Sequence, residues 1–274
     1  MQLRIRHRTA YRYDDSVKYS AQALRLTPRR EGRQRVLGWT IHAPGRRIEQ
    51  LDAHGNVTHL LTLEDPHREI EIMVSGIVEV EADGGTMRHE GALSPLAYLA
   101  NTPLTLADAA IAELAREHLA SRAAPLRARL HALAGAVQSR VKYQKGSTSV
   151  EDTAIAALAR GQGVCQDQAH VFIACCRAAG VPARYVSGYL YDNSGSGAGL
   201  TGVAASHAWI DAWDDTQGAW LGIDVTHAEP AGARHCRLAV GRDYLDAAPV
   251  RGVRRGGGRE IMSVDVTVEK AQDQ

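Results

Sequence analysis

The hydrophobic pattern of the chain changes near residue 95. Before that point, apolar side chains recur at every second position, a spacing that predicts half-buried β-strands. The alternating positions are Leu3, Ile5, Tyr11, Leu37, Trp39, Ile41, Val57, Leu61, Leu63, Ile70, Ile72, Val74, Val78 and Val80. Turn-forming sequences separate these runs at 43–45, 54–56 and 83–85. We therefore expect residues 1–95 to form an N-terminal antiparallel, β-sandwich-like module.

Beyond this module the spacing of apolar residues becomes helical. Two stripes with this spacing occur between residues 105 and 160. They consist of Ile111, Leu114 and Leu119, and then of Leu126, Leu130, Leu133 and Val137. A further apolar helix and three short strands follow, the strands near 183–191, 205–213 and 219–224. This order predicts an α+β fold in which helices pack on an antiparallel sheet, and a second domain at 96–274. Within it we expect a loop at 251–259 and a closing strand at 261–269.

The helix that follows residue 164 begins with a cysteine. Gly180 and Pro182 predict that this helix ends near Ala179, so Cys165 lies at its start. Free backbone amides and the helix dipole favour a thiolate at such a position. A cysteine at a helix start is also a common small buried residue, so the assignment of a nucleophile depends on partners further along the chain.

Two short strands downstream supply those partners. The strand at 206–213 carries His207 near its start, and the strand at 219–224 ends in Asp224. Only the turn at 214–218 separates them, which predicts a hairpin that brings His207 and Asp224 to the same end of the sheet. Asp211 shares a face with His207, but two pleats along a strand are roughly 13 Å, too far for contact. Cysteine, histidine and aspartate in this arrangement form an activated thiol.

Several motifs together resemble the bacterial transglutaminase-like cysteine peptidase family. They are Gly-Val-Cys165-Gln-Asp, Gly-Val-Pro-Ala-Arg184-Tyr, Ser-His207-Ala-Trp, Asp224-Val-Thr and, near the amino end, Tyr11-Arg-Tyr and Gly55-Asn56. The resemblance covers nearly the whole chain. It implies a papain-like, transglutaminase-like catalytic core at 96–274, with Cys165, His207 and Asp224 as the catalytic residues. The chain departs from the family pattern at His227, where asparagine is expected, and at Gln168, where an aromatic residue is common.

The predicted function is thiol-dependent hydrolysis of a peptide or protein amide through an acyl-enzyme. Cys165 attacks the carbonyl, His207 moves the proton, and Asp224 orients the imidazole. The backbone amide of Cys165 is the expected first oxyanion donor, and Gln162, Gln166 and Tyr143 are candidates for the second. Transglutaminase-type transfer to an amine is one alternative, and a catalytically silent binding module is another. The Gly/Ser-rich segment 192–204 has little bulk to shield a thioester from water, which favours hydrolysis.

Metal chemistry has weaker support in the sequence. Six residues could act as ligands: Cys165, His170, His207, His227, His235 and Cys236. They lack zinc-binding spacings such as Cys-x-x-Cys, and no acidic calcium loop is present. We therefore expect neither a metal nor a cofactor, and we interpret His170 and His235 as structural histidines.

Composition limits the class of protein. With 45% hydrophobic and 23% charged residues the chain is typical of a globular protein, and its net charge of +1 gives no overall attraction to nucleic acid or membrane. Four cysteines, two of them adjacent, do not form a disulfide framework. The amino-terminal residues alternate charge with bulk and lack the apolar region of a secretory signal. These features predict a reduced, cytoplasmic protein.

Overall fold

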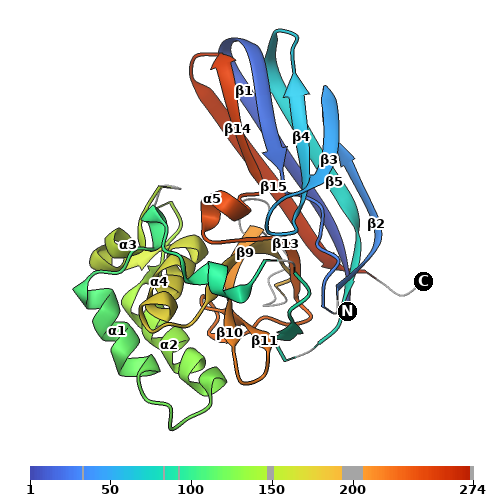
Figure 1. The fold of residues 1–274 in the computed structure, drawn as a ribbon. Helices are drawn as coiled ribbons and strands as arrows, with labels where there is room; N and C mark the ends of the chain where they lie inside the picture. The colour runs from blue at the N-terminus through green and yellow to red at the C-terminus, as the bar shows by residue number, and fades with distance from the viewer. Residues whose placement is uncertain (33, 83, 92, 147–150, 193–205, 272–274) are drawn as a thin grey trace.

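The structure is a computed structural model that describes residues 1–274 except 33, 83, 92, 147–150, 193–205 and 272–274. It has three layers (Figure 1): a group of helices, a central six-stranded sheet, and a long seven-stranded sheet that extends well beyond the other two. The fold is α+β with mostly antiparallel sheets, as the sequence predicts.

The seven-stranded sheet is built around a single long strand. This strand, β1 (Gln2–Leu24), pairs along one side with β4 (Val57–Leu63) and then β5 (His67–Val80). Along the other side it pairs with β14 (Val250–Gly256) and then β15 (Glu260–Lys270). The outer strands β2 (Gln34–His42) and β3 (Arg46–Leu51) pair with β5 and β4.

The C-terminal strands correct the predicted domain division. We expected 251–259 to be a loop and 261–269 to close the second domain, but β14 and β15 both belong to the first sheet through β1. Gly256, the last residue of β14, and the two glycines that follow it have positive φ, which allows β14 and β15 to follow β1 as one interrupted partner. The short strand β6 (Thr86–Arg88), by contrast, pairs with β11 in the second sheet. The N-terminal module therefore includes the carboxyl end of the chain.

The second sheet carries the strands that the sequence placed downstream of the cysteine. Its order is β12-β11-β10-β9-β13, with β6 added beside β11. The bounds are β9 Ala183–Leu190, β10 Ser206–Asp214, β11 Ala219–Asp224, β12 Glu229–Pro230 and β13 His235–Gly241. A separate parallel pair consists of β7 (Lys142–Tyr143) and β8 (Gln162–Gly163).

The helices gather on one face of this second sheet (Figure 1). They are α1 (Ala109–Leu119), α2 (Leu126–Arg140), α3 (Ala154–Arg160), α4 (Cys165–Ala178) and the short α5 (Tyr244–Ala247), with 3-10 turns at Pro95–Leu99 and Pro103–Thr105. Helix α4 is buried along most of its length and packs against α1, α2, α3, β9 and β10. Because α4 is central to this core, its first residue is held in a fixed position relative to the sheet.

The two sheets pack on each other through a second core. Tyr189 on β9 and Leu238 on β13 join the apolar residues of β1, β4 and β5. The fully buried Asn56, in the turn before β4, extends this contact, because its side-chain amide donates to the carbonyl of Val240 and accepts from its N–H, both at 2.8 Å. The central sheet is thus covered by helices on one face and by the long sheet on the other.

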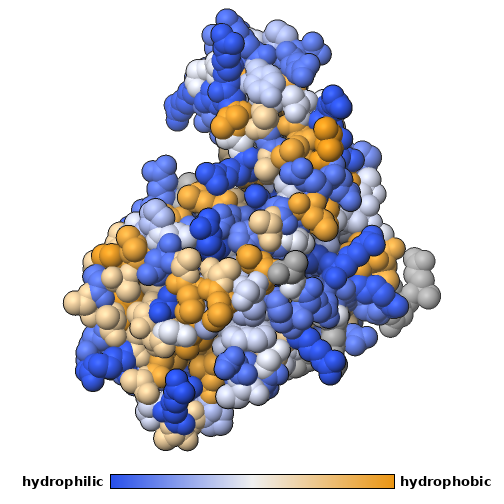
Figure 2. All heavy atoms as spheres, in the orientation of Figure 1, coloured by the Kyte–Doolittle hydropathy of each residue, from blue (hydrophilic) through white to orange (hydrophobic). Residues whose placement is uncertain are grey.

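The outer surface mixes polar and apolar residues on the visible face (Figure 2). No helix in the described part of the chain has the length and hydrophobicity that crossing a membrane requires.

Candidate active site

Cys165 is the first residue of α4, as the sequence predicts. The helix begins after Val164, whose N–H donates to the Asp167 carboxylate at 2.7 Å and so closes the first turn. A Cβ atom at Gly163 would lie 2.7 Å from Cβ of Asp167, so only glycine allows the chain to approach this turn. The helix ends at Ala178, and Gly180 takes a left-handed φ of 74°.

Cys165 differs from the other cysteines in its surroundings. It is partly exposed, whereas Cys175, Cys176 and Cys236 are fully buried, and all four thiols are free. Burial raises the pKa of Cys175 to about 12 and raises those of Cys176 and Cys236 as well. The three buried thiols therefore stay protonated and inaccessible, which leaves Cys165 as the thiol available for chemistry.

The predicted hairpin brings His207 and Asp224 together. Strands β10 and β11 pair in antiparallel register, with Ile210 opposite Ile223. Nε2 of His207 lies 2.8 Å from Oδ2 of Asp224, and both side chains are buried. Because Nε2 is engaged by the carboxylate, Nδ1 is the ring nitrogen that remains for the thiol.

The environment of His207 stabilises its charged form. Burial alone would lower the pKa of His207, but its hydrogen bonds to Asp224 and to Cys165 raise that pKa to about 10. Conversely, burial would raise the pKa of Asp224, and hydrogen bonds from His207, His227 and His235 hold it far below its ordinary value. At neutral pH the pair is therefore an imidazolium beside a carboxylate, with the thiol on the far side of the ring.

Two further histidines bind the same carboxylate oxygen. Nδ1 of His227 lies 2.8 Å from Oδ2 of Asp224, and Nε2 of His235 lies 3.0 Å from it. His227 is exposed, in the turn that follows β11, while His235 is buried at the start of β13. The structure thus places His235, which we interpreted as merely structural, against Asp224. The position of His227, three residues after Asp224, could have indicated from the sequence that it lies near this carboxylate. His235 lies near Asp224 only because of the register in which β13 pairs with β9.

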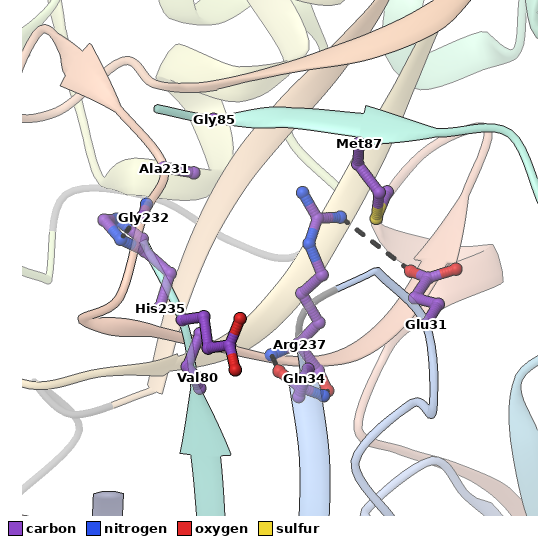
Figure 3. A pocket seen from close by; sticks show the side chains of 10 residues that line it. Glu31, Gln34, Val80, Gly85, Met87, Ala231, Gly232, His235 and Arg237 are labelled. Carbon is purple, nitrogen blue, oxygen red and sulfur yellow. Dashed lines mark hydrogen bonds and ion pairs between the residues drawn. The ribbon is translucent and has the colours of Figure 1, made fainter. Parts of the chain in front are cut away.

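Asp211 has a separate role between the two sheets. Its fully buried carboxylate accepts from Nε of Arg184 at 2.9 Å and from Nη1 of Arg237 at 2.7 Å. Although burial alone would raise the pKa of Asp211, the charges of these two arginines keep it below its ordinary value. Arg237 also lies 4.0 Å from Glu31, across a cavity of about 30 Å³ that is shown in Figure 3. Asp211 is therefore committed to an ion network and does not orient His207.

Gln168 ties the turn after Asp224 to the helix of the cysteine. Its Nε2 donates to the carbonyl of Val141 at 2.8 Å, and its Oε1 accepts from the hydroxyl of Thr226 at 2.7 Å. An aromatic residue could not make this pair of bonds. Gln168 therefore holds the Thr226–His227 turn in place.

Tyr143, one of the proposed oxyanion donors, is about half exposed. Partial burial raises the pKa of its hydroxyl, and the negative charge of a nearby Cys165 thiolate raises that pKa further. The segment 193–205, which includes most of the Gly/Ser-rich stretch at 192–204, lies outside the described residues.

The predicted metal ligands divide into two groups. His170 accepts the N–H of Tyr244 at 3.1 Å, and Cys236 packs in the core between the sheets, so neither is part of the site. Among the described residues, two sets have donor atoms within 4.8 Å of one another: His207, Asp224 and His235, and Asp224, His227 and Glu229. Their donor atoms already have protein partners, since three ring nitrogens face Asp224 and Glu229 pairs with Arg234. The geometry is that of a carboxylate held by hydrogen bonds, which does not favour a metal centre.

Comparison with known proteins agrees with this geometry. Residues 3–79 match the bacterial transglutaminase-like N-terminal region, and residues 112–225 match the transglutaminase-like superfamily. The second range contains Cys165, His207 and Asp224, whereas His227 and His235 lie beyond it. An uncharacterized protein of Mycobacterium leprae is 33% identical over 286 residues, which are 97% of this chain and 97% of that protein. An uncharacterized protein of Mycobacterium tuberculosis (H37Rv) is 35% identical over 287 residues, with 97% of this chain and 91% of that protein covered.

The chain belongs to the transglutaminase-like superfamily, with the bacterial transglutaminase-like region at its amino end. A solved structure from Cytophaga hutchinsonii, described as that of a candidate cysteine protease, has the same fold. It superposes with a TM-score of 0.77 at 20% identity, covering 100% of this chain and 92% of the other. The arrangement of the helices, the central sheet and the long sheet therefore occurs in both structures.

Proposed function

We propose that the protein is a thiol-dependent amide or peptide hydrolase that acts through Cys165, His207 and Asp224. The observation that carries the proposal is the chain of contacts from the thiol at the start of α4, through an imidazole with a raised pKa, to a buried carboxylate 2.8 Å from it. A buried ion pair of this kind is costly to form, and chains of contacts like this one concentrate at sites of covalent catalysis.

Each residue has a distinct task in this reaction. The thiolate of Cys165 attacks the carbonyl carbon of the amide, and the oxygen of that carbonyl takes up negative charge near the amides at the start of α4. His207 donates its Nδ1 proton to the leaving amine, which departs and leaves a thioester on Cys165. The neutral ring then removes a proton from water, whose oxygen attacks the thioester and releases the acid. Asp224 holds Nε2 of His207 throughout and stabilises the imidazolium.

Transfer of the acyl group to an amine uses the same thioester and is the alternative outcome. The contacts of the triad do not distinguish between the two, because the difference lies in whether water or an amine reaches the acyl-enzyme. Partial exposure of Cys165 supports hydrolysis, since transfer needs a site that shields the thioester from water. The substrate that we propose is a peptide or protein amide.

The test is incubation of the protein with a glutamine-containing peptide library, a fluorescent primary amine and a chelator. The proposal expects ammonia or peptide fragments without incorporation of the amine. A Cys165→Ala variant is the matched control and should release neither product. Amine incorporation that appears only when calcium is added would contradict hydrolysis. Hydrolysis that persists in the Cys165→Ala variant would contradict the role of the thiol.

A further inference from the structure

We propose that His235 is a positioning residue of this site, which acts in its neutral form by fixing the Asp224 carboxylate so that it faces His207. This inference deepens the proposed function and rests on it for the role of His207. It concerns a residue outside the range that matches the transglutaminase-like superfamily. Its basis is the set of contacts made by the His235 ring.

The two ring nitrogens of His235 have different partners. The N–H of Gly232 donates to Nδ1 of His235 at 3.1 Å, so Nδ1 carries no hydrogen. The hydrogen of the neutral ring is therefore on Nε2, which lies 3.0 Å from Oδ2 of Asp224. Figure 3 shows His235 beside Gly232 at one side of the cavity between the sheets. A backbone amide thus selects the tautomer that donates to Asp224.

The surroundings of His235 keep the ring neutral and in place. Only 4% of the residue is exposed, and its ring meets that of Trp209 edge-on with 5.2 Å between the centroids. Burial lowers the pKa of His235, although its bond to Asp224 opposes this effect. The ring therefore contributes a hydrogen bond without adding a positive charge beside His207.

His227 differs from His235 in the direction of its pKa shift. It binds the same oxygen, but its hydrogen bond to Asp224 raises its pKa above 6.5, so at pH 6 it competes with His207 for the carboxylate as a second cation. The N–H of His227 also donates to Oδ1 of Asp224 at 3.2 Å. A carboxylate without the His235 bond would turn towards His227 and away from His207. The hydrogen bond from Nε2 of His235 to Oδ2 opposes that rotation.

Two substitutions separate the donor from the rest of the ring. In a His235→Gln variant, the amide nitrogen takes the place of Nε2 and keeps the bond to Asp224. In a His235→Asn variant, the amide oxygen takes the place of Nδ1, which keeps the contact with Gly232 but loses the donor. Circular dichroism and urea unfolding of both variants show whether each is folded. His227→Asn, which keeps a neutral donor to Asp224 but removes the competing charge, is the comparison variant, and its rate should not fall below that of the wild type.

The readout is the rate at which iodoacetamide alkylates Cys165 at pH 6, which requires no substrate. Loss of one hydrogen bond to a buried charge predicts a rate about tenfold slower in His235→Asn, with His235→Gln within about threefold of the wild type. Once a substrate is identified, His235→Asn should lower kcat and leave KM unchanged. Equal rates in the wild type and His235→Asn would overturn the proposal, as would equal losses in the Asn and Gln variants.

A measurement on the unmodified protein keeps the proposal testable if His235→Asn does not fold. Nitrogen-15 NMR of histidine-labelled protein at pH 7 should show His235 with hydrogen on Nε2 and none on Nδ1. A charged ring, or hydrogen on Nδ1, would contradict the proposal. A wild-type protein that is alkylated rapidly but hydrolyses no amide would refute the proposed function and leave the result for His235 standing.

Discussion

Nδ1 of His227 and Nε2 of His207 both lie 2.8 Å from Oδ2 of Asp224, with 5.5 Å between the centroids of the two rings. Although burial opposes it, hydrogen bonding to Asp224 raises the pKa of both rings, and the charge of His207 lowers the pKa of His227. Below pH 6.5 a single carboxylate therefore faces two imidazolium groups. His227 and the predicted catalytic histidine are therefore coupled through the carboxylate that they share.

A His227→Asn variant should make the thiol more reactive. The asparagine amide keeps a donor for Asp224 but removes the positive charge, so the imidazolium of His207 becomes more stable. Two unit charges at this distance interact by about 1 to 3 kcal/mol at intermediate dielectric, which predicts alkylation of Cys165 at pH 5 to 6 several times faster than in the wild type. Timed labelling with iodoacetamide measures the rate. A slower rate would show that His227 assists His207 and does not compete with it.

Labelling should also distinguish among the four cysteines. Cys165 is partly exposed, while burial excludes reagents from the other three and raises the pKa of each of them. Mass-mapped alkylation of the folded protein near pH 6 should therefore modify Cys165 first, by at least about tenfold over any other site. Denatured protein, in which all four thiols react, is the control. Comparable early labelling of Cys236 would contradict the assignment.

Substitution of the two buried aspartates, Asp224 and Asp211, should have different effects on turnover and on stability. The asparagine of an Asp224→Asn variant has no negative charge with which to stabilise the imidazolium of His207. The variant should therefore fold, but its turnover should fall by about a hundredfold or more. Asp211→Asn leaves Arg184 and Arg237 without their carboxylate, which predicts a loss of about 3 to 5 kcal/mol in the free energy of unfolding. Urea titration and kcat of the folded fraction separate these effects. A larger loss of kcat in Asp211→Asn would reverse the two assignments.

His7 should make folding sensitive to acid. Burial lowers the pKa of His7 from 6.5 to about 4, while its ring bonds the hydroxyls of Tyr189 and Thr9 at 2.7 Å. Between pH 6.5 and pH 4 the unfolded chain therefore binds a proton at His7 that the folded chain does not bind. The contribution of neutral His7 to the free energy of unfolding is fully present above pH 6.5 and is lost as the pH falls to 4. The loss amounts to about 3 kcal/mol. A His7→Asn variant should show a smaller decrease in the free energy of unfolding between pH 7 and pH 4.5; an unchanged decrease would contradict the assignment.

The parts of the site that the sequence predicts depend on local patterns. The start and end of the Cys165 helix follow from glycine and proline signals, and the contact between His207 and Asp224 follows from a short hairpin with an unambiguous turn. In both cases the residues that set the geometry lie within about twenty positions of one another. Their catalytic roles stay predictions until they are measured.

The features that the sequence does not predict depend on long-range pairing. The strand β15 alternates clearly, but nothing in its own residues shows that its partner is β1, at the opposite end of the chain. His235 likewise carries no local signal, because it meets Asp224 only when β13 pairs with β9. Asp211 was excluded as a partner of His207 on distance, yet its pairing with Arg184 and Arg237 could not be read from the strand that carries it.

Cys165, activated by His207, should form an acyl-enzyme. This intermediate can be detected by intact-mass spectrometry of the protein quenched in acid shortly after mixing with an activated ester, p-nitrophenyl acetate. We expect one acetyl group per chain, located on Cys165 by peptide mapping. The adduct should be absent in Cys165→Ala and slow to form in His207→Ala. Acetylation elsewhere, or an equally rapid adduct in His207→Ala, would rule out Cys165 as the nucleophile activated by His207.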